Sequence, residues 1–433
     1  MAIATPGSST AVSPNPSSPS SYTGPLAVVT TLFFMWGFLT CLNDILVPHL
    51  KSIFDLNYTR VMLIQFAFFG AYFLFSLPSA KIIDWMGYQR SMVVGLLTMG
   101  LGAFLFVPAA MVPSYPLFLG ALIVLAAGIT CLQVAANPYV TVLGKPETAS
   151  SRLNLTQAFN SLGTFLAPFF GGLFILSAAP KTMDEIRAMA PDVLQAFRVH
   201  EAATVKTPYV GLGIALVVLA VAIACFKLPK IPQAQHKVGE KVDDSIWKHP
   251  NLIFGAIGIF VYVGAEVSIG SFLVNYFGQP EIGGLTEKVA ASFVAFYWGG
   301  AMVGRFIGSG LLQKMDTGKL LGICSVCAAA LVAISMLTTG HTAMYSIILV
   351  GFFNSIMFPS IFTLGVAELG PLTGDGSGVM IMAIVGGALI PVAQGAIADR
   401  IGIHHAFFLP VICYLYILYF ALSGSKPNSK RHA

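Results

Sequence analysis

Long apolar runs separated by short polar loops are the feature that most constrains the fold of this chain. A helix needs about 20 apolar residues to cross the hydrocarbon core of a bilayer. Only 9% of the 433 residues are charged and 56% are hydrophobic, so a water-soluble fold would have too little charge on its surface. We therefore predict an all-α integral membrane protein with twelve transmembrane helices, over 26–50, 60–83, 91–111, 116–143, 152–177, 208–228, 251–278, 287–312, 319–339, 342–368, 376–399 and 404–423.

The polar segments predict the domain organisation and the sidedness. An even number of spans places both termini on one side, and the loops and tail on that side hold 14 Lys and Arg against eight on the other. This bias predicts that both termini are cytoplasmic. We expect a disordered cytoplasmic tail at 1–24, an N-terminal six-helix bundle at 25–228, a cytoplasmic linker at 229–250, a C-terminal six-helix bundle at 251–424 and a cytoplasmic tail at 425–433.

A sequence repeat relates the two predicted bundles. The strings NPYVTVLG and FPSIFTLG lie 221 residues apart, and each precedes a predicted helix. In those helices Gly163 and Pro168 match Gly386 and Pro391 at an offset of 223 residues. Many secondary transporters consist of two related halves with the substrate site between them at the middle of the membrane. The repeat therefore favours a transporter.

Polar side chains recur at helical spacing inside several predicted spans. They are costly in a bilayer unless they face a cavity or a partner, so each one marks a candidate site. Amides both donate and accept hydrogen bonds, which suits the hydroxyls of a neutral sugar, and an aromatic ring can cover the C–H face of that sugar. The alternative is that the amides only join helices to one another. The candidate substrate-binding residues are Trp36, Asn43, Gln133, Asn137, Gln157, Asn160, Asn275, Trp298 and Asn354.

Three charged residues lie inside predicted spans and away from their ends. Asp44 falls near the middle of the first span, where desolvation favours the neutral form of a carboxyl group. Protonation or cation binding would then make it easier to close a cavity around this side chain, so we expect Asp44 to couple transport to an ion gradient. Glu266 and Arg305 are either a structural ion pair or substrate contacts, and the sequence does not assign their partners.

The strings FFMWGFLTCLNDILVPHL, LQVAANPYVTVLG and SSRLNLTQAFNSLGT resemble the fucose permease family of the major facilitator superfamily, most closely its bacterial glucose/galactose transporter branch. The resemblance implies the major facilitator fold of two six-helix bundles, alternating access and cation-coupled sugar uptake. It places Asp44 on the coupling carboxylate of the family and Gln157 and Asn160 on its sugar-binding amides. Gln133 stands where we expect the fucose permease to carry a glutamate, and Glu266 is a candidate to replace that coupling group.

The loop SAKIIDWMGYQR (79–90) carries Asp84, Gly87 and Arg90 at the spacing DxxGxxR. It resembles a degraded form of the superfamily's loop signature, in which the acid caps a helix end and latches the two halves together. We therefore expect Asp84 and Arg90, together with Arg305, to have structural or gating roles.

The sequence as a whole predicts a symporter that imports a neutral hexose such as glucose or galactose, with a proton as the first candidate for the coupled ion. We expect a functional monomer in the lipid of a bacterial inner membrane, with no metal, no nucleic-acid partner and no cofactor other than the co-transported proton or sodium ion. Sodium coupling remains an alternative, as do fucose and N-acetylglucosamine as substrates. A membrane-embedded enzyme and a non-transporting sugar sensor are the competing classes. An enzyme would need a catalytic acid near a base, and His49 with Asp44 is the only candidate pair. A sensor would normally carry a signalling domain, and none is evident.

Overall fold

A computed structural model describes residues 22–54, 58–112, 114–174, 188–204, 206–231 and 244–427 of the protein, and the side chains of 42–62, 169–174 and 201–204 lie outside this description. The longer helices are α1 (Thr23–Phe54), α2 (Tyr58–Met111), α3 (Tyr115–Val142), α4 (Ala149–Phe174), α6 (Pro191–Thr204), α7 (Lys206–Cys225), α8 (Pro250–Gly278), α9 (Glu287–Leu311), α10 (Thr317–Leu337), α11 (Gly340–Asn354), α12 (Met357–Gly365), α13 (Thr373–Met382), α14 (Gly386–Ile401) and α16 (Phe408–Tyr419). The short helix α15 (Ile403–Ala406) and several single 3₁₀ turns connect them.

The helices account for all twelve predicted spans. Ten helical segments of the described residues are long and apolar enough to cross a membrane. One of these, Leu63–Met111, contains two predicted spans that meet at Gly87, where φ is 79° and the helix breaks. The remaining predicted span is α4. The all-α membrane fold is therefore confirmed, with helix ends that differ from the predicted ends by a few residues.

The span predicted at 376–399 is divided into α13 and α14 by the 3₁₀ turn Ala383–Val385. Two further features depart from the predicted helices. The first is α6, which lies in a loop that the sequence indicated only as polar, because a search for apolar runs does not find a charged helix. The second is a break in the span predicted at 342–368, where α11 ends at Asn354 and α12 begins at Met357. Pro359 lacks the N–H that would bond to the Ser355 carbonyl, which favours a break at this point.

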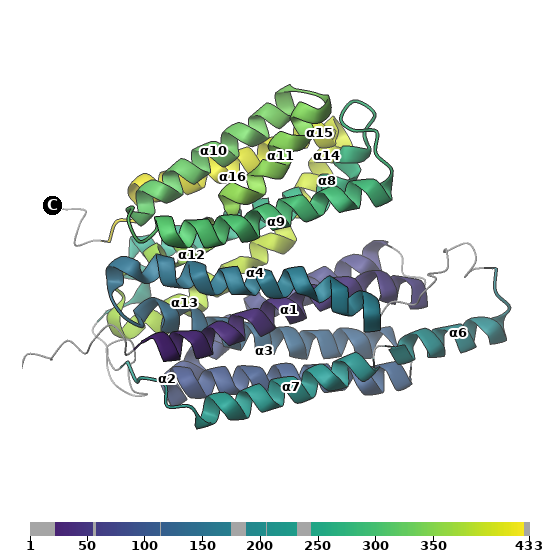
Figure 1. Ribbon diagram of the computed structural model, residues 1–433, viewed down its shortest axis with the longest axis horizontal. Coiled ribbons are helices and arrows are strands. Elements are labelled where there is room, and N and C mark those ends of the chain that lie inside the picture. Colours follow the sequence, from purple (N-terminus) through teal and green to yellow (C-terminus); the bar gives the residue numbers. More distant parts are fainter. Residues whose placement is uncertain are drawn as a thin grey trace, which may run out of the picture.

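The helices form two groups that follow the chain (Figure 1). In the first half, α2 packs against α3 and α7, and α1 packs against α4; in the second half, α8 packs against α12, α14 and α16. The halves meet where α13 contacts α2 and α3, and where α4 contacts α9 and α12. The domain boundaries on either side of 229–250 stay a prediction, since residues 232–243 are outside the described chain.

Two glycines of the sequence repeat perform the same packing task in the two halves. A Cβ atom on Gly163 of α4 would lie 2.3 Å from the Phe34 carbonyl oxygen of α1. A Cβ atom on Gly386 of α14 would lie 2.0 Å from the Phe260 carbonyl oxygen of α8. Small residues at such positions let the backbones of membrane helices approach closely. The α1–α4 and α8–α14 pairs therefore use equivalent crossings, which supports the repeat.

We expect Gly163→Ala and Gly386→Ala each to lower the thermal stability of the protein in detergent. The added methyl group would meet a backbone carbonyl that cannot rotate away, and overpacking of this kind typically costs about 1–3 kcal/mol. Thermal unfolding followed by intrinsic fluorescence measures the loss. Gly120→Ala on α3 is the matched control, because a Cβ there meets open space. Equal stability of all three variants would contradict the crossing argument.

Candidate functional site

The polar face of α4 divides into a part that contacts the second half and a part that contacts α1. Asn154 donates from Nδ2 to the Arg305 carbonyl oxygen at 2.8 Å and to Ser309 Oγ at 3.2 Å, both on α9. Six residues further along α4, Asn160 donates from Nδ2 to the Phe33 carbonyl oxygen of α1 at 2.9 Å. Asn154 therefore joins the halves, whereas Asn160 lies at the crossing of α1 and α4.

Three other amide side chains of the first half carry buried atoms without a protein partner. Gln133 of α3 donates from Nε2 to the Tyr72 hydroxyl at 2.7 Å, but its Oε1 has no hydrogen-bond partner. Nε2 of Gln157 and both side-chain polar atoms of Asn137 likewise have no hydrogen-bond partner. All three side chains are buried. Since buried polar atoms are rarely left unpaired, these donors and acceptors are suited to a polar ligand.

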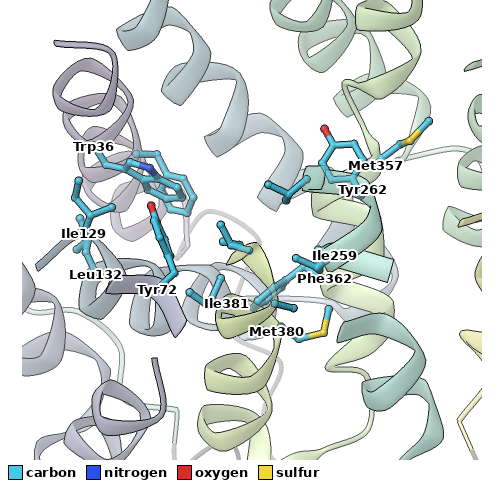
Figure 2. Close-up of a cluster of buried hydrophobic side chains, with 14 of the residues drawn as sticks. Trp36, Tyr72, Ile129, Leu132, Ile259, Tyr262, Met357, Phe362, Met380 and Ile381 are labelled. Atoms are coloured by element: carbon cyan, nitrogen blue, oxygen red, sulfur yellow. The ribbon is translucent and has the colours of Figure 1, made fainter. Parts of the chain in front are cut away.

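Aromatic rings lie beside the amides in the first half. Trp36 is buried, and its ring centroid lies 4.9 Å from that of Phe33, the residue whose carbonyl accepts from Asn160. Trp36 and Tyr72 belong to one cluster of buried side chains (Figure 2). In the second half, Trp298 is half-exposed, packs edge-on against Tyr297 and lies against Gly270 of α8. Trp298 therefore packs at the contact of α8 with α9.

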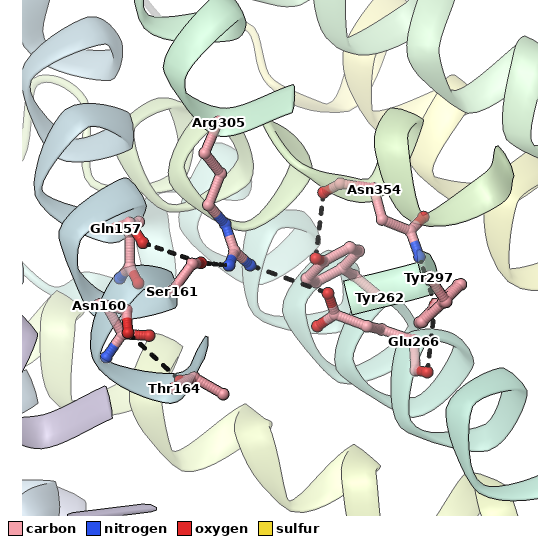
Figure 3. Close-up of polar contacts among 9 residues, drawn as sticks. All are labelled: Gln157, Asn160, Ser161, Thr164, Tyr262, Glu266, Tyr297, Arg305 and Asn354. Carbon is pink, nitrogen blue, oxygen red and sulfur yellow. Dashed lines mark hydrogen bonds and ion pairs between the residues drawn. The ribbon is translucent and has the colours of Figure 1, made fainter. Parts of the chain in front are cut away.

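The second half contains a chain of buried hydrogen bonds that links α8, α9 and α11 (Figure 3). The Tyr262 hydroxyl donates to the Asn354 carbonyl oxygen at 3.1 Å, and Asn354 Nδ2 donates to the Tyr297 hydroxyl at 2.9 Å. The Tyr297 hydroxyl in turn donates to the Glu266 carbonyl oxygen at 3.3 Å. Asn354 therefore lies inside this network, which fixes the backbone that carries Glu266.

Arg305 of α9 connects the network with the polar face of α4. Its Nη2 lies 3.8 Å from Glu266 Oε1, and its Nη1 donates a hydrogen bond to Ser161 Oγ (Figure 3). Ser161 follows Asn160 directly and lies one turn after Gln157. The pairing of Glu266 with Arg305 is the ion pair that the sequence left open.

The loop that contains Gly87 makes a second connection between the halves. Asp84 is nearly buried; its Oδ2 lies 3.3 Å from Lys81 Nζ, which also lies 2.8 Å from Asp375 Oδ1 on α13. Asp84 Oδ1 is 3.8 Å from the point where Gly374 would carry a Cβ, next to the first residue of α13. A carboxylate there interacts favourably with a helix N-terminus. The latch role of Asp84 stays a prediction, and Arg90 is exposed.

Several hydroxyl and amide contacts join the halves at the same end of the molecule as this loop. They are Ser150 Oγ with Thr363 Oγ1 at 2.6 Å, Ser151 Oγ donating to the Ser309 carbonyl oxygen at 2.7 Å, Ser377 Oγ donating to the Val134 carbonyl oxygen at 2.8 Å, and Thr317 Oγ1 donating to Ser150 Oγ at 3.0 Å. Asn154, described above, adds to them. Arg305 with Ser161 is a further polar contact between the halves, and Ser161 lies close to Gln157 and Asn160 in sequence.

Other predicted residues lie elsewhere or outside the description. Asn275 is exposed and lies three residues before the end of α8 at Gly278. The backbone of α1 passes through Asn43 and Asp44, but their side chains lie outside the described residues. The assigned roles of all candidate residues stay predictions.

The sequence missed the tyrosines that hold the polar groups in place. Tyr72 and Tyr297 gave no signal among the 14 tyrosines of the chain. Tyr262 lies four residues before Glu266, hence on the same face of α8, and this spacing could have indicated it.

Comparison with known proteins places this arrangement in a family. The family model described as Major Facilitator Superfamily matches residues 27–390. The chain is 54% identical to a protein named glucose/galactose transporter from Brucella abortus biovar 1 (strain 9-941), over 95% of this chain and 96% of the relative. The crystal structure of a variant of the Escherichia coli fucose:proton symporter superposes with a TM-score of 0.87 at 33% identity, covering 94% of this chain and 100% of the other.

A second solved structure shows a Major Facilitator Superfamily transporter in the outward conformation. It matches with a TM-score of 0.85 at 33% identity, over 94% of this chain and 100% of the other. The family match spans most of the chain, and the Brucella relative is similar over nearly its whole length. The chain is therefore a multi-pass membrane protein that belongs to the Major Facilitator Superfamily.

Proposed function

We propose that this protein imports a neutral hexose, glucose or galactose, by proton-coupled alternating access across a bacterial inner membrane. The observation that carries the proposal is the set of unpartnered amide atoms on Gln133 and Gln157, buried among the helices of the first half. They offer an acceptor and a donor to sugar hydroxyls, and Trp36 supplies an aromatic surface nearby. The glucose/galactose transporter of Brucella, 54% identical to this chain, supports the choice of sugar.

The coupling step rests on a carboxylate that changes charge during the cycle. Asp44 is our first candidate and Glu266 the second. Neutralising a carboxylate lowers the cost of moving it into an apolar, closed site, so ion binding and closure favour each other. The similarity to a fucose:proton symporter favours a proton over sodium as the coupled ion. The alternatives are sodium coupling, and fucose or N-acetylglucosamine as the sugar.

The contacts between the halves suggest which conformation the structure represents. The hydroxyl, amide and ion-pair contacts around Lys81, Asn154 and Ser377 gather at one end. If the termini are cytoplasmic, as the charge bias predicts, this is the cytoplasmic end, and the site opens outward. The similarity to a transporter solved in the outward conformation supports this assignment. One chain holds both halves, so we propose a functional monomer, and a transporter rather than an enzyme.

Asp44→Asn should abolish the accumulation of sugar against a gradient while leaving sugar exchange intact. The amide keeps the size of the side chain but cannot take up a proton. Proteoliposomes that contain the purified protein, with labelled glucose and with proton and sodium gradients imposed separately, measure both activities. Glu287→Gln, at an exposed position at the start of α9, is the control and should behave as the wild type. Wild-type accumulation by Asp44→Asn would refute the coupling role.

Gln157→Ala should weaken sugar affinity from several-fold to about a hundredfold. Leaving a buried hydrogen bond unmade costs about 1–3 kcal/mol, and each 1.4 kcal/mol is a factor of ten. Isothermal titration of the purified protein with glucose measures the change. Asn251→Ala is the matched control, since this buried amide lies at the start of α8 and its Nδ2 donates to the carbonyls of Leu364, Gly365 and Ala367. An unchanged affinity in Gln157→Ala would remove this residue from the site.

A further inference from the structure

The ion pair of Glu266 and Arg305 is incompletely satisfied for two charges that are largely, but not fully, buried. Its shortest separation, 3.8 Å, exceeds the roughly 2.7–2.9 Å of a charge-assisted hydrogen bond. Neither Glu266 Oε1 nor Arg305 Nε has a hydrogen-bond partner in the protein. Burying two charges costs more than their attraction returns unless further hydrogen bonds satisfy them. A pair whose only task was to hold α8 against α9 would be expected to close more tightly.

The ion pair lies where its unpartnered hydrogen-bonding atoms could contact a ligand. Both side chains are about one-seventh exposed, so neither is sealed into the helix core. Arg305 already reaches across the interface to Ser161, one turn after Gln157, whose Nε2 is unpartnered. Figure 3 shows Gln157, Asn160 and Ser161 on one side of Arg305 and Glu266 on the other. A carboxylate acceptor and a guanidinium donor thus face the amide-bearing side of α4.

The support behind Glu266 is rigid. The hydrogen bonds among Tyr262, Asn354 and Tyr297 end on the Glu266 backbone carbonyl, and all three side chains are buried. This network fixes the backbone from which the Glu266 side chain projects, so that its carboxylate starts from a defined position on α8.

We propose that Glu266 and Arg305 form the sugar-contact site of the second half, with Glu266 accepting a hydrogen bond from one sugar hydroxyl and Arg305 donating to a neighbouring oxygen. The inference rests on the proposed sugar transport and deepens it. The ligand would then touch α4 in the first half and α8 and α9 in the second. Because the two charges cancel, the site favours a neutral sugar over a sugar acid or a sugar phosphate.

Deoxyglucoses, each of which lacks one hydroxyl, test the proposed sugar contacts one hydroxyl at a time. Binding of glucose and of 2-, 3-, 4- and 6-deoxyglucose is measured by titration calorimetry on the full-length wild type and on Glu266→Gln. In the wild type, removing the contacted hydroxyl should lower affinity about tenfold. In Glu266→Gln the amide oxygen can still accept a hydrogen bond but carries no charge, so glucose affinity should fall several-fold, and the variant should distinguish glucose from that one deoxyglucose less than the wild type does. Glu281→Gln, at an exposed loop position, is the control and should retain the wild-type pattern.

Arg305→Lys is a second test of the sugar contact, because lysine keeps the positive charge but loses the planar set of hydrogen-bond donors. Its affinity loss should likewise depend on which hydroxyl is present. Equal losses for every sugar, or no loss in either variant, would overturn the assignment and leave the proposed transport function standing. If the wild type bound none of these sugars, the proposed function would fail and this inference with it. Thermal unfolding of each variant establishes that it is folded before titration.

Discussion

The pairing of polar groups inside an apolar bilayer is the constraint on which the rest of this structure depends. Helices satisfy the backbone within each span, because lipid offers no hydrogen bonds in place of water. The polar side chains must then find partners on other helices. Asn154 donates to α9 and Asn160 to α1, while Gln133 donates to Tyr72 of α2. The hydrogen bonds that these amides make join helices, and the unpartnered buried atoms of Gln133, Asn137 and Gln157 are suited to a polar ligand.

Close helix crossings decide where these side chains lie. Gly163 brings α4 against α1, and Gly386 brings α14 against α8 in the same way. The first crossing places Asn160 against the backbone of α1, beside Phe33 and Trp36. The second crossing fixes α8, which carries Tyr262 and Glu266. The repeat therefore does more than duplicate helices, since each copy positions one set of polar groups toward the middle of the molecule.

The sequence predicted the spans well and the contacts poorly, for a physical reason. Span length follows from bilayer thickness, so the predicted ends fall within a few residues of the observed ones. The pairing of helices depends on packing between distant segments, so Arg305 and Glu266 could be recognised as costly but not matched to each other or to Ser161. Tyr72 and Tyr297 were missed because a tyrosine in an apolar span resembles any other core aromatic. The helix break after Asn354 was not predicted because the apolar run continues through it. Helix α6 was not predicted because a charged helix forms no apolar run.

The contacts that hold the two halves together are numerous but individually weak. Most are single hydrogen bonds between hydroxyls, amides and carbonyls, each worth about 0.5–1.5 kcal/mol. The ion pair of Lys81 with Asp375 adds little, because the lysine side chain is two-thirds exposed and such pairs contribute about 0–1 kcal/mol. An interface of this kind can exchange its contacts for others at a small difference in free energy. A ligand that bridges α4, α8 and α9 could then shift the balance between two conformations, since it needs only to bind one of them more tightly.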